Sequence, residues 1–284
     1  MSVADPRVSA QWLREHLDDM NLVVLDARIH RGVDAQGASL YASGRNDFEQ
    51  SGHIPGAGFA DLFGGFSAAD GRFLFTRPTA AQLQAELQRL GVHERSHVVV
   101  YDSLNGVWAA RVWWLLLAYG QARVSVLDGG LAQWQAAGGG LAFGQAAPVV
   151  PGDACSQEIA GRFVDLAEVK AWLRQPGDGQ LVCALRGSEY AAGHIPGSLS
   201  LPYADWLDEQ GRLDVHKVHE TTSALNVAPN AELTLYCGGG VNACGLALGL
   251  LAAGHAVEHL HVYDGSLNEW RAHPELPLVS GAQP

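Results

Sequence analysis

The chain has 284 residues, of which 48% are hydrophobic, with 30 acidic and 18 basic side chains and a formal net charge of −12. This length and hydrophobic content predict a folded chain with room for two domains, each with its own core. The negative charge argues against nucleic acid and against anionic membrane surfaces as partners, because both would repel the protein at long range. Small molecules and proteins are the partners that we expect.

The first half alternates helix signals with short apolar runs. A helix is expected to begin near Ser9, and Thr79 with Gln82 three residues later is typical of a capped helix start. Apolar runs at residues 22–25, 98–101 and 124–127 predict strands, and residues 109–118 predict a helix. A short helix should end near Trp134.

The second half follows the same order. Asp165 with Glu168 predicts a capped helix, residues 181–184, 233–236 and 260–263 predict strands, and residues 243–253 predict a helix. Short apolar strands that alternate with helices indicate an α/β fold with a mainly parallel sheet flanked by helices on both faces.

Two motifs occur twice. Gly-His-Ile-Pro-Gly stands at residues 52–56 and again at 193–197, and an Asp-Gly pair precedes a tryptophan at 128–134 and again at 264–270. Two matches at nearly one offset indicate a duplicated domain. The stretch 138–153 is rich in Gly, Ala and Pro, so we expect domains at residues 1–140 and 161–284 with a linker at 141–160.

The candidate nucleophile is Cys237, which directly follows the strand at 233–236. Three successive glycines come next and can curl the backbone so that several N–H groups point at the sulfur, and the start of a helix adds its positive dipole end. This arrangement favours a thiolate, which is an anionic nucleophile. The residues of the anion-binding loop are Gly238, Gly239, Gly240, Val241, Asn242 and Ala243.

The first copy has Asp102 where the second has Cys237, so it offers no thiol and is expected to be non-catalytic. Arg111 follows that loop on an apolar helix and is a candidate substrate-binding residue. His53 and His194 occupy matching turns, which favours a structural role over a catalytic one. Cys244 is conceivable as a resolving thiol, but a small buried side chain is the simpler interpretation.

The other three cysteines, Cys155, Cys183 and Cys244, make no disulfide framework or zinc motif together with Cys237, and no metal site is expected. The longest apolar run, residues 112–119, is too short to span a bilayer, and the first residues show no signal-peptide pattern. We therefore expect a cytoplasmic protein.

The paired Gly-His-Ile-Pro-Gly motifs, the cysteine loop in the second copy only and the Asp-Gly and Trp elements resemble the tandem-domain rhodanese and 3-mercaptopyruvate sulfurtransferase family. The resemblance covers nearly the whole chain and implies two tandem rhodanese-like domains. It also implies that Cys237 takes sulfur from 3-mercaptopyruvate or thiosulfate, holds it as a persulfide, and passes it to cyanide, a thiol or a thioredoxin-like acceptor. No metal or organic cofactor is implied.

The chain departs from the family pattern around the donor. The mercaptopyruvate branch uses a serine, an aspartate and a histidine at positions that correspond here to Gly239, Phe63 and Phe75. An arginine that precedes an aromatic residue in the family is replaced by Glu189, and the nearby Arg186 is the candidate substitute. The uncharged loop favours mercaptopyruvate over the thiosulfate dianion, which gains more from a nearby cation.

Two other functions fit part of the pattern. A cysteine phosphatase also places a thiolate in a strand-loop-helix cradle, but it needs an arginine six residues after the cysteine, where this chain has Ala243. A non-enzymatic sulfur-carrier or binding module would form the persulfide and pass it only to a dedicated protein. Multiple turnover with small donors and acceptors separates an enzyme from such a carrier.

Overall fold

A computed structural model describes residues 6–33, 39–175, 177 and 179–283. The chain divides into two compact units, which are described separately here. Unit 1 comprises Met1–Gly71 and Arg77–Glu158, and unit 2 comprises Arg72–Thr76 and Ile159–Pro284. The five residues 72–76 therefore pack with unit 2, although unit 1 flanks them in sequence.

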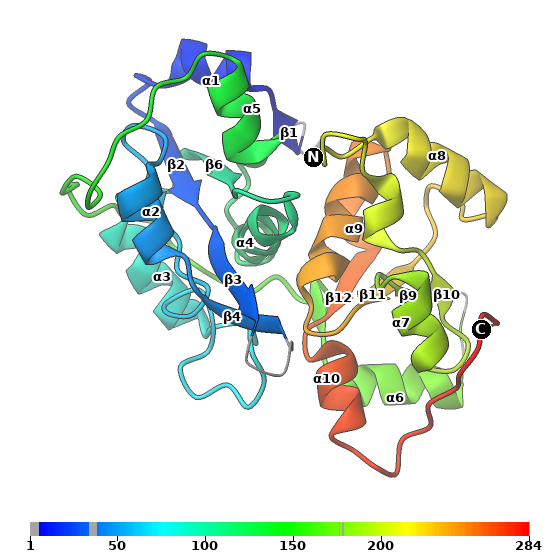
Figure 1. Cartoon of the computed structure of the whole chain (residues 1–284). Coiled ribbons are helices and arrows are strands. Elements are labelled where there is room, and N and C mark those ends of the chain that lie inside the picture. The colour runs from blue at the N-terminus through cyan, green and yellow to red at the C-terminus, as the bar shows by residue number, and fades with distance from the viewer. Residues whose placement is uncertain (1–5, 34–38, 176, 178, 284) are drawn as a thin grey trace. The chain divides into compact units, whose positions relative to one another are not determined.

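Unit 1 is built on a five-stranded parallel sheet (Figure 1). Its strands, in the order β1-β7-β6-β2-β5, are β1 (Arg7–Val8), β7 (Val124–Leu127), β6 (His97–Tyr101), β2 (Leu22–Asp26) and β5 (Gly58–Phe59). Helices α1 (Ala10–His16), α2 (Arg45–Ser51) and α5 (Gly130–Ala136) share one core cluster with the sheet. Helix α4 (Val107–Ala118) packs against β6 and β7, and α3 (Ala80–Arg89) completes the unit. An antiparallel pair, β3 (Ile29–Val33) and β4 (Ser39–Ser43), follows β2.

Unit 2 has a second five-stranded parallel sheet, in the order β10-β9-β11-β12-β8. Its strands are β10 (Leu199–Ser200), β9 (Gln180–Cys183), β11 (Leu233–Tyr236), β12 (Leu260–Tyr263) and β8 (Phe163–Val164). Helices α6 (Leu166–Arg174), α7 (Gly187–Ala192) and α10 (Ser266–Arg271) share a core cluster with this sheet. Helix α9 (Val241–Ala252) packs against β11 and β12, and α8 (Val215–Ala224) packs on α9. Two 3₁₀ turns, η1 (Tyr203–Trp206) and η2 (Val257–His259), complete unit 2.

The two sheets have the same strand order when each is listed from the strand that follows the Gly-His-Ile-Pro-Gly turn. Strands β5-β2-β6-β7-β1 of unit 1 correspond to β10-β9-β11-β12-β8 of unit 2. The prediction of an α/β fold with a parallel sheet flanked by helices in each of two related halves is thereby confirmed.

The predicted helix starts are present in the structure. The backbone N–H of Trp12 donates to Ser9 Oγ at 3.0 Å, and that of Gln82 donates to Thr79 Oγ1 at 3.2 Å. Asp165 donates its N–H to Glu168 Oε2 at 2.7 Å, as the capping pattern requires. The sequence interpretation missed helices α2, α7, α8 and α10, strands β3 and β4 and the two-residue strands, because such short or polar segments carry little hydrophobic periodicity.

The repeated turn histidines have structural roles in both units, as expected. His53 Nδ1 lies 3.0 Å from the carbonyl oxygen of Phe48, and its ring stacks on the Phe48 ring at 3.7 Å. His194 Nδ1 lies 2.9 Å from the carbonyl oxygen of Tyr190, and the two rings stack at 3.6 Å. Each histidine fixes the turn to the end of the preceding helix.

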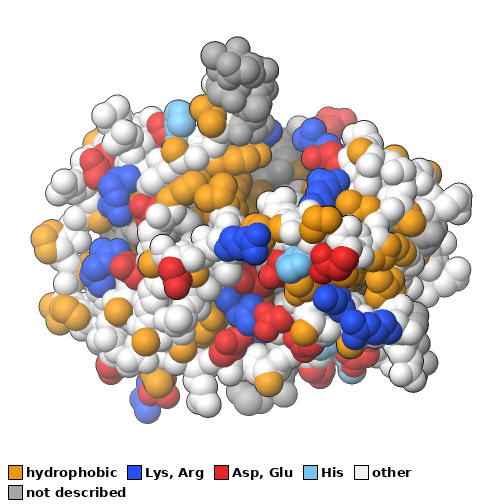
Figure 2. Space-filling view, turned by 90° about the horizontal axis from the view of Figure 1, so that it is seen from below, with side chains coloured by type: hydrophobic (Ala, Val, Ile, Leu, Met, Phe, Trp, Pro, Cys, Tyr) orange, Lys and Arg blue, Asp and Glu red, His pale blue; other side chains and the backbone are white. Residues whose placement is uncertain are grey.

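The expected linker lies largely on unit 1. The N–H of Gly152 donates to Gln88 O at 2.8 Å, and that of Gln157 donates to Tyr119 O at 3.1 Å. No helix in the described residues is long and apolar enough to cross a membrane. On the face seen in Figure 2, basic side chains are interspersed with acidic ones and do not form one continuous patch.

Candidate active site

Cys237 lies at the carboxyl edge of the unit 2 sheet, one residue beyond β11. Its side chain is buried, with 2% of its surface exposed, whereas the next two glycines are half-buried. Gly240 has φ 78° and ψ −1°, which is the left-handed conformation that favours glycine, and α9 begins at the next residue. The loop therefore curls tightly from the strand into the helix.

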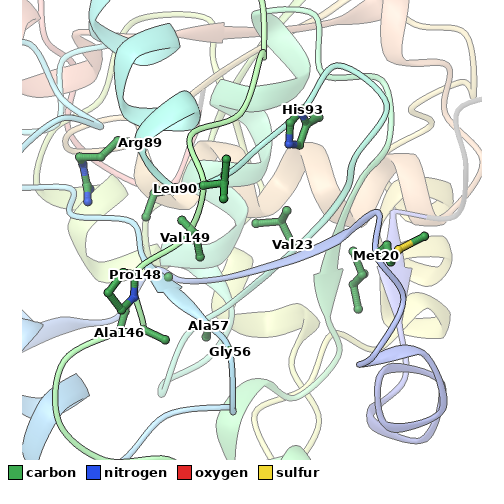
Figure 3. A pocket seen from close by; sticks show the side chains of 15 residues that line it. Met20, Val23, Gly56, Ala57, Arg89, Leu90, His93, Ala146, Pro148 and Val149 are labelled. Carbon is green, nitrogen blue, oxygen red and sulfur yellow. The ribbon is translucent and has the colours of Figure 1, made fainter.

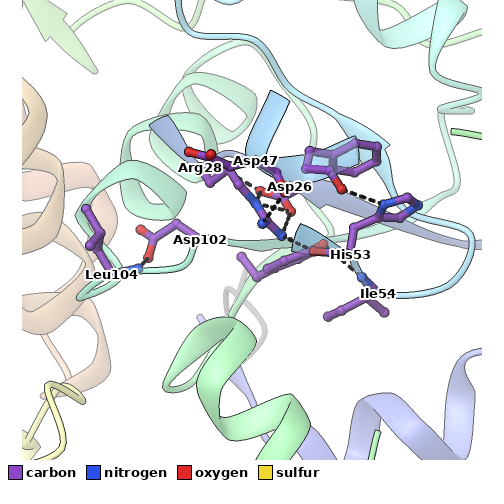
Figure 4. A network of polar contacts seen from close by, with 10 residues as sticks. Asp26, Arg28, Asp47, His53, Ile54, Asp102 and Leu104 are labelled. Atoms are coloured by element: carbon purple, nitrogen blue, oxygen red, sulfur yellow. Dashed lines mark hydrogen bonds and ion pairs between the residues drawn. The ribbon is translucent and has the colours of Figure 1, made fainter. Parts of the chain in front are cut away.

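The corresponding loop of unit 1 shows what this geometry binds. Asp102 Oδ1 accepts the N–H groups of Leu104 at 2.8 Å (Figure 4) and Gly106 at 3.1 Å. Its Oδ2 accepts those of Trp108 at 3.0 Å and Ala109 at 3.1 Å. Burial raises the pKa of the Asp102 carboxyl, and these four backbone N–H groups oppose that rise. Four donors and one carboxyl group fit best when the carboxyl is ionised, so this loop is an anion cradle filled by its own side chain.

Cys237 stands where Asp102 stands. Gly106 and Gly240 have nearly the same dihedral angles, 83°, −5° and 78°, −1°, and each precedes its helix by one residue. The carbonyl of Asp102 accepts the N–H of Leu131 at 2.9 Å, and that of Cys237 accepts the N–H of Leu267 at 3.0 Å. The loop in unit 2 is one residue shorter, since the left-handed glycine follows three residues after the cysteine instead of four after the aspartate.

Ser266 is a site residue that the sequence analysis missed. The N–H of Cys237 donates to Ser266 Oγ at 3.2 Å, and that hydroxyl donates to the carbonyl of Tyr263 at 2.8 Å. Ser266 is fully buried and left-handed, with φ 49°, a conformation that costs free energy for a residue with a Cβ. Unit 1 has Gly130 at the matching position, with φ 54°. An alignment of the two repeats therefore contained a signal for this residue, because unit 2 has a serine at the position where unit 1 has a glycine.

Two of the positions at which the chain departs from its family pattern lie together. A Cβ built on Gly239 would be 4.0 Å from Phe75 Cδ2 and 3.7 Å from the Leu74 carbonyl oxygen, both in the 72–76 segment of unit 2. Phe75 is buried and has a left-handed φ of 67°. An aromatic ring and a glycine thus stand beside the cysteine loop where the family pattern has polar side chains.

The strand beside Cys237 carries a neutral group where unit 1 carries charges. Cys183 pairs with Tyr236 in register, and burial raises the pKa of its thiol to about 11, so it is protonated at neutral pH. The matching Asp26 of unit 1 forms a buried ion pair with Arg28, with Nη2 and Oδ2 2.6 Å apart (Figure 4). Unit 2 has Leu185 in place of that arginine, so it lacks the ion pair at this position.

The remaining candidates lie in different environments. Arg186 is exposed at the start of α7, three residues beyond β9 and at the same carboxyl edge of the sheet as Cys237. Arg111 is fully buried within α4 of unit 1. Cys244 is also fully buried, and its thiol donates to the carbonyl of Gly240 at 3.1 Å, which ties the first turn of α9 to the loop.

A separate hollow of about 440 Å³ lies in unit 1 (Figure 3). Most of the residues that line it are apolar or glycine, and none of them is a cysteine. Arg89 pairs with Glu86 at 2.7 Å, and His93 pairs with Asp153 at 3.0 Å, so both of its basic side chains have carboxylate partners. Nothing in this lining supports nucleophilic chemistry.

Comparison with known proteins identifies the family. The profile described as Rhodanese-like domain matches residues 9–137 and 166–273. The chain belongs to the rhodanese family. A probable 3-mercaptopyruvate sulfurtransferase of Pseudomonas aeruginosa is 38% identical, over 96% of this chain and 98% of that protein. Human 3-mercaptopyruvate sulfurtransferase is 32% identical, over 96% of this chain and 95% of its own length.

A solved structure extends the comparison. The crystal structure of SseA from Escherichia coli, described as a 3-mercaptopyruvate sulfotransferase with the rhodanese fold, superposes with a TM-score of 0.81 at 27% identity. The match covers 93% of this chain and 99% of that one. The chain is a sulfurtransferase, an enzyme that takes sulfur from a donor and passes it to a thiol acceptor. This confirms the family, the fold and the enzyme class predicted from the sequence.

Proposed function

We propose that Cys237 is the nucleophile that carries the sulfur, and that residues 238–243 form the cradle for its thiolate and persulfide. In this proposal residues 161–284 are the catalytic domain, residues 1–140 the non-catalytic domain and residues 141–160 the linker. The observation that carries it is the unit 1 loop, which holds the Asp102 carboxylate with four backbone N–H groups. A loop of closely similar shape around a cysteine would stabilise a sulfur anion by the same means.

The reaction has two sulfur transfers. The Cys237 thiolate attacks the sulfur of 3-mercaptopyruvate, the C–S bond breaks, and its electron pair leaves with the carbon as the enolate of pyruvate. The enolate takes up the proton that the donor thiol carried, which leaves pyruvate and an anionic Cys237 persulfide. An acceptor thiolate then attacks the outer sulfur, forms a new persulfide and releases the Cys237 thiolate. With cyanide as acceptor the product is thiocyanate.

The proposed donor is 3-mercaptopyruvate in preference to thiosulfate. The loop from Cys237 to Ala243 contains no cation, and thiosulfate, a dianion, would gain more from one than the mercaptopyruvate monoanion does. The names of the Pseudomonas and human relatives support this choice. We assign the donor-binding charge to Arg186, because it is exposed at the same sheet edge as Cys237; its backbone N–H donates to Glu189 Oε2 at 3.3 Å, whereas its guanidinium has no carboxylate partner among the described residues. Arg111 is a weaker candidate for this role because it is fully buried.

The proposed acceptor is a low-molecular-weight thiol or a thioredoxin-like protein, and the proposed location is the cytoplasm, where thiols are kept reduced. The four cysteines are all free in the structure, as such a compartment requires. A dedicated sulfur carrier would stall after one transfer, whereas the proposed enzyme continues to release pyruvate.

The test is steady-state kinetics with both donors on the wild type, Cys237→Ser, Arg186→Ala and Cys155→Ser. Cys237→Ser should lose all turnover, whereas Cys155→Ser, which changes an exposed thiol, should match the wild type. Arg186→Ala should raise the donor KM and leave the acceptor KM unchanged. Turnover that survives in Cys237→Ser would refute the assignment of the nucleophile, and an unchanged donor KM in Arg186→Ala would refute that of the cation.

A further inference from the structure

The rim of the cysteine loop is open on one side. A Cβ built on Gly238 would meet no atom within 4 Å, although this residue follows the buried Cys237 directly. Gly238 is half-buried and has no left-handed φ, so its backbone does not require glycine. Among the described residues of unit 2, the space beside Gly238 is therefore open at this distance, and we call it the open approach.

The other side of the rim is bounded by Asn268. Its backbone N–H donates to the carbonyl of Gly238 at 2.9 Å, which fixes residue 268 against the loop. Its side-chain Nδ2 lies 3.3 Å from the position that a Cβ on Gly239 would take. Asn268 is exposed, and within the described part of the chain its amide group has no hydrogen-bond partner. The Asn268 side chain thus places an N–H donor without an acceptor among the described residues at the edge of the open approach.

The matching residue of unit 1 is Ala132, which is also exposed. Both residues lie in the first turn of a helix, α5 or α10, two positions after its left-handed first residue, Gly130 or Ser266. The turn therefore folds without a side-chain amide, and only the copy that has the cysteine carries one. The amide is therefore not needed to form this helix start.

We propose that the Asn268 amide recognises the anionic group of the sulfur donor. The inference rests on Cys237 being the nucleophile, because it places the donor beside the cysteine loop. Donors of this reaction carry oxygen anions, such as the carboxylate of 3-mercaptopyruvate, and an N–H donor at the rim would bind one of these oxygens while the sulfur reaches Cys237. The loop itself has no cation, so a neutral amide at its rim would add a directed hydrogen bond to the donor beside the charge that we assign to Arg186.

The test compares Asn268→Ala and Asn268→Asp with the wild type, with Ala132→Asn in unit 1 as the matched control. A hydrogen bond to a charged group is worth about tenfold or more in binding, so Asn268→Ala should raise the KM for 3-mercaptopyruvate about tenfold and change kcat by less than about twofold. Asn268→Asp should raise the KM for 3-mercaptopyruvate further, because the new carboxylate repels the carboxylate of the donor. Ala132→Asn should match the wild type.

Two further measurements separate recognition from structure. Reduction of the preformed persulfide by a small thiol in a single turnover should proceed at the wild-type rate in Asn268→Ala, and its melting temperature should be unchanged. Gly238→Ala, which adds a methyl group to the open approach, should raise the donor KM without loss of stability.

An unchanged donor KM in both Asn268 variants would overturn the inference, as would a loss of kcat and stability with KM unaltered. Neither result touches the proposed nucleophile, which is tested separately by Cys237→Ser and by the mass of the persulfide.

Discussion

The loops at 102–109 and 237–243 have similar backbone conformations but differ in their first side chain. Both turn a buried strand into a helix through a left-handed glycine, and in unit 1 the backbone N–H groups of the loop bind its first side chain. In unit 1 that side chain is a carboxylate, which satisfies the N–H groups permanently and closes the cradle. In unit 2 it is a thiol, and in our proposal the cradle binds the negative charge that forms on this sulfur during the reaction.

The comparison extends to the neighbouring strand. Unit 1 keeps the buried pair of Asp26 and Arg28, and unit 2 replaces it with Cys183 and Leu185. A fixed carboxylate in a low-dielectric environment next to Cys237 would oppose a second negative charge there. Unit 2, which carries Cys237, is therefore neutral at the positions where unit 1 is charged, and substitutions can reverse each difference.

The largest effect is expected from Cys183→Asp. It places an aspartate at the position of Asp26 without an arginine partner, so the free energy of unfolding should fall by about 3–5 kcal/mol. Adding Leu185→Arg should restore part of that loss by recreating the ion pair of unit 1. Denaturant unfolding measures both, with Cys183→Ser as the neutral control. Equal stability of Cys183→Asp and Cys183→Ser would contradict the expectation.

Asp102→Ala should have the next largest effect. It leaves four backbone N–H groups without their acceptor, so the free energy of unfolding should fall by about 2–4 kcal/mol. Sulfur transfer per folded molecule should stay at the wild-type level, because the loop of unit 1 has no thiol and we propose that this unit is non-catalytic. Urea unfolding and the kcat of the folded fraction measure the two quantities. A stable variant with reduced kcat would show that the loop of unit 1 acts in the reaction.

Substitutions of Ser266 should separate the free-energy cost of its left-handed backbone from its role in positioning Cys237. Ser266→Ala and Ser266→Gly both remove the acceptor of the Cys237 N–H, so kcat should fall about tenfold in each through misplacement of the nucleophile. Ser266→Gly should be about 1 kcal/mol more stable than Ser266→Ala, because glycine adopts the left-handed conformation without strain. In the control Gly130→Ala, a Cβ would lie 2.4 Å from the carbonyl oxygen of Asp102, so stability should fall with kcat retained. Different kcat values in the two Ser266 variants would contradict this account.

The smallest effect is expected at acid pH in unit 2. Burial, followed by the charge of His219, lowers the pKa of His255 below its ordinary value of 6.5. Below about pH 6.5 the unfolded chain protonates His255 more readily than the folded chain does. The neutral, buried His255 therefore contributes to the free energy of unfolding above about pH 6.5, and this contribution is lost as the pH falls below that value toward the lowered pKa of the folded state. Thermal melts of His255→Gln against pH should show a shallower acid decline than the wild type. Parallel declines would contradict the assignment.

Much of the fold was predictable because its signals are local. The caps at Ser9, Thr79 and Asp165 and the strands at 233–236 and 260–263 are written in consecutive residues. The cysteine loop was predictable for the same reason, since the strand, the glycines and the helix follow one another.

The surroundings of the cysteine were not predictable in this way. Ser266 and Asn268 come from the turn after β12 and reach the loop only because β11 and β12 are neighbours in the sheet. Phe75 comes from a segment about 160 residues away in sequence, and its left-handed backbone has no local signature. Such contacts depend on tertiary packing, and sequence spacing does not encode them.

The central claim is that the loop of unit 2 holds a sulfur anion on Cys237 as the loop of unit 1 holds the Asp102 carboxylate. Intact-mass spectrometry of the protein after exposure to 3-mercaptopyruvate without an acceptor tests it most directly. We expect the mass of the wild type to rise by one sulfur atom, located by peptide mapping at Cys237 and absent in Cys237→Ser, with Cys155, Cys183 and Cys244 unmodified. A wild-type mass that does not change, or an added sulfur on another cysteine, would contradict the claim.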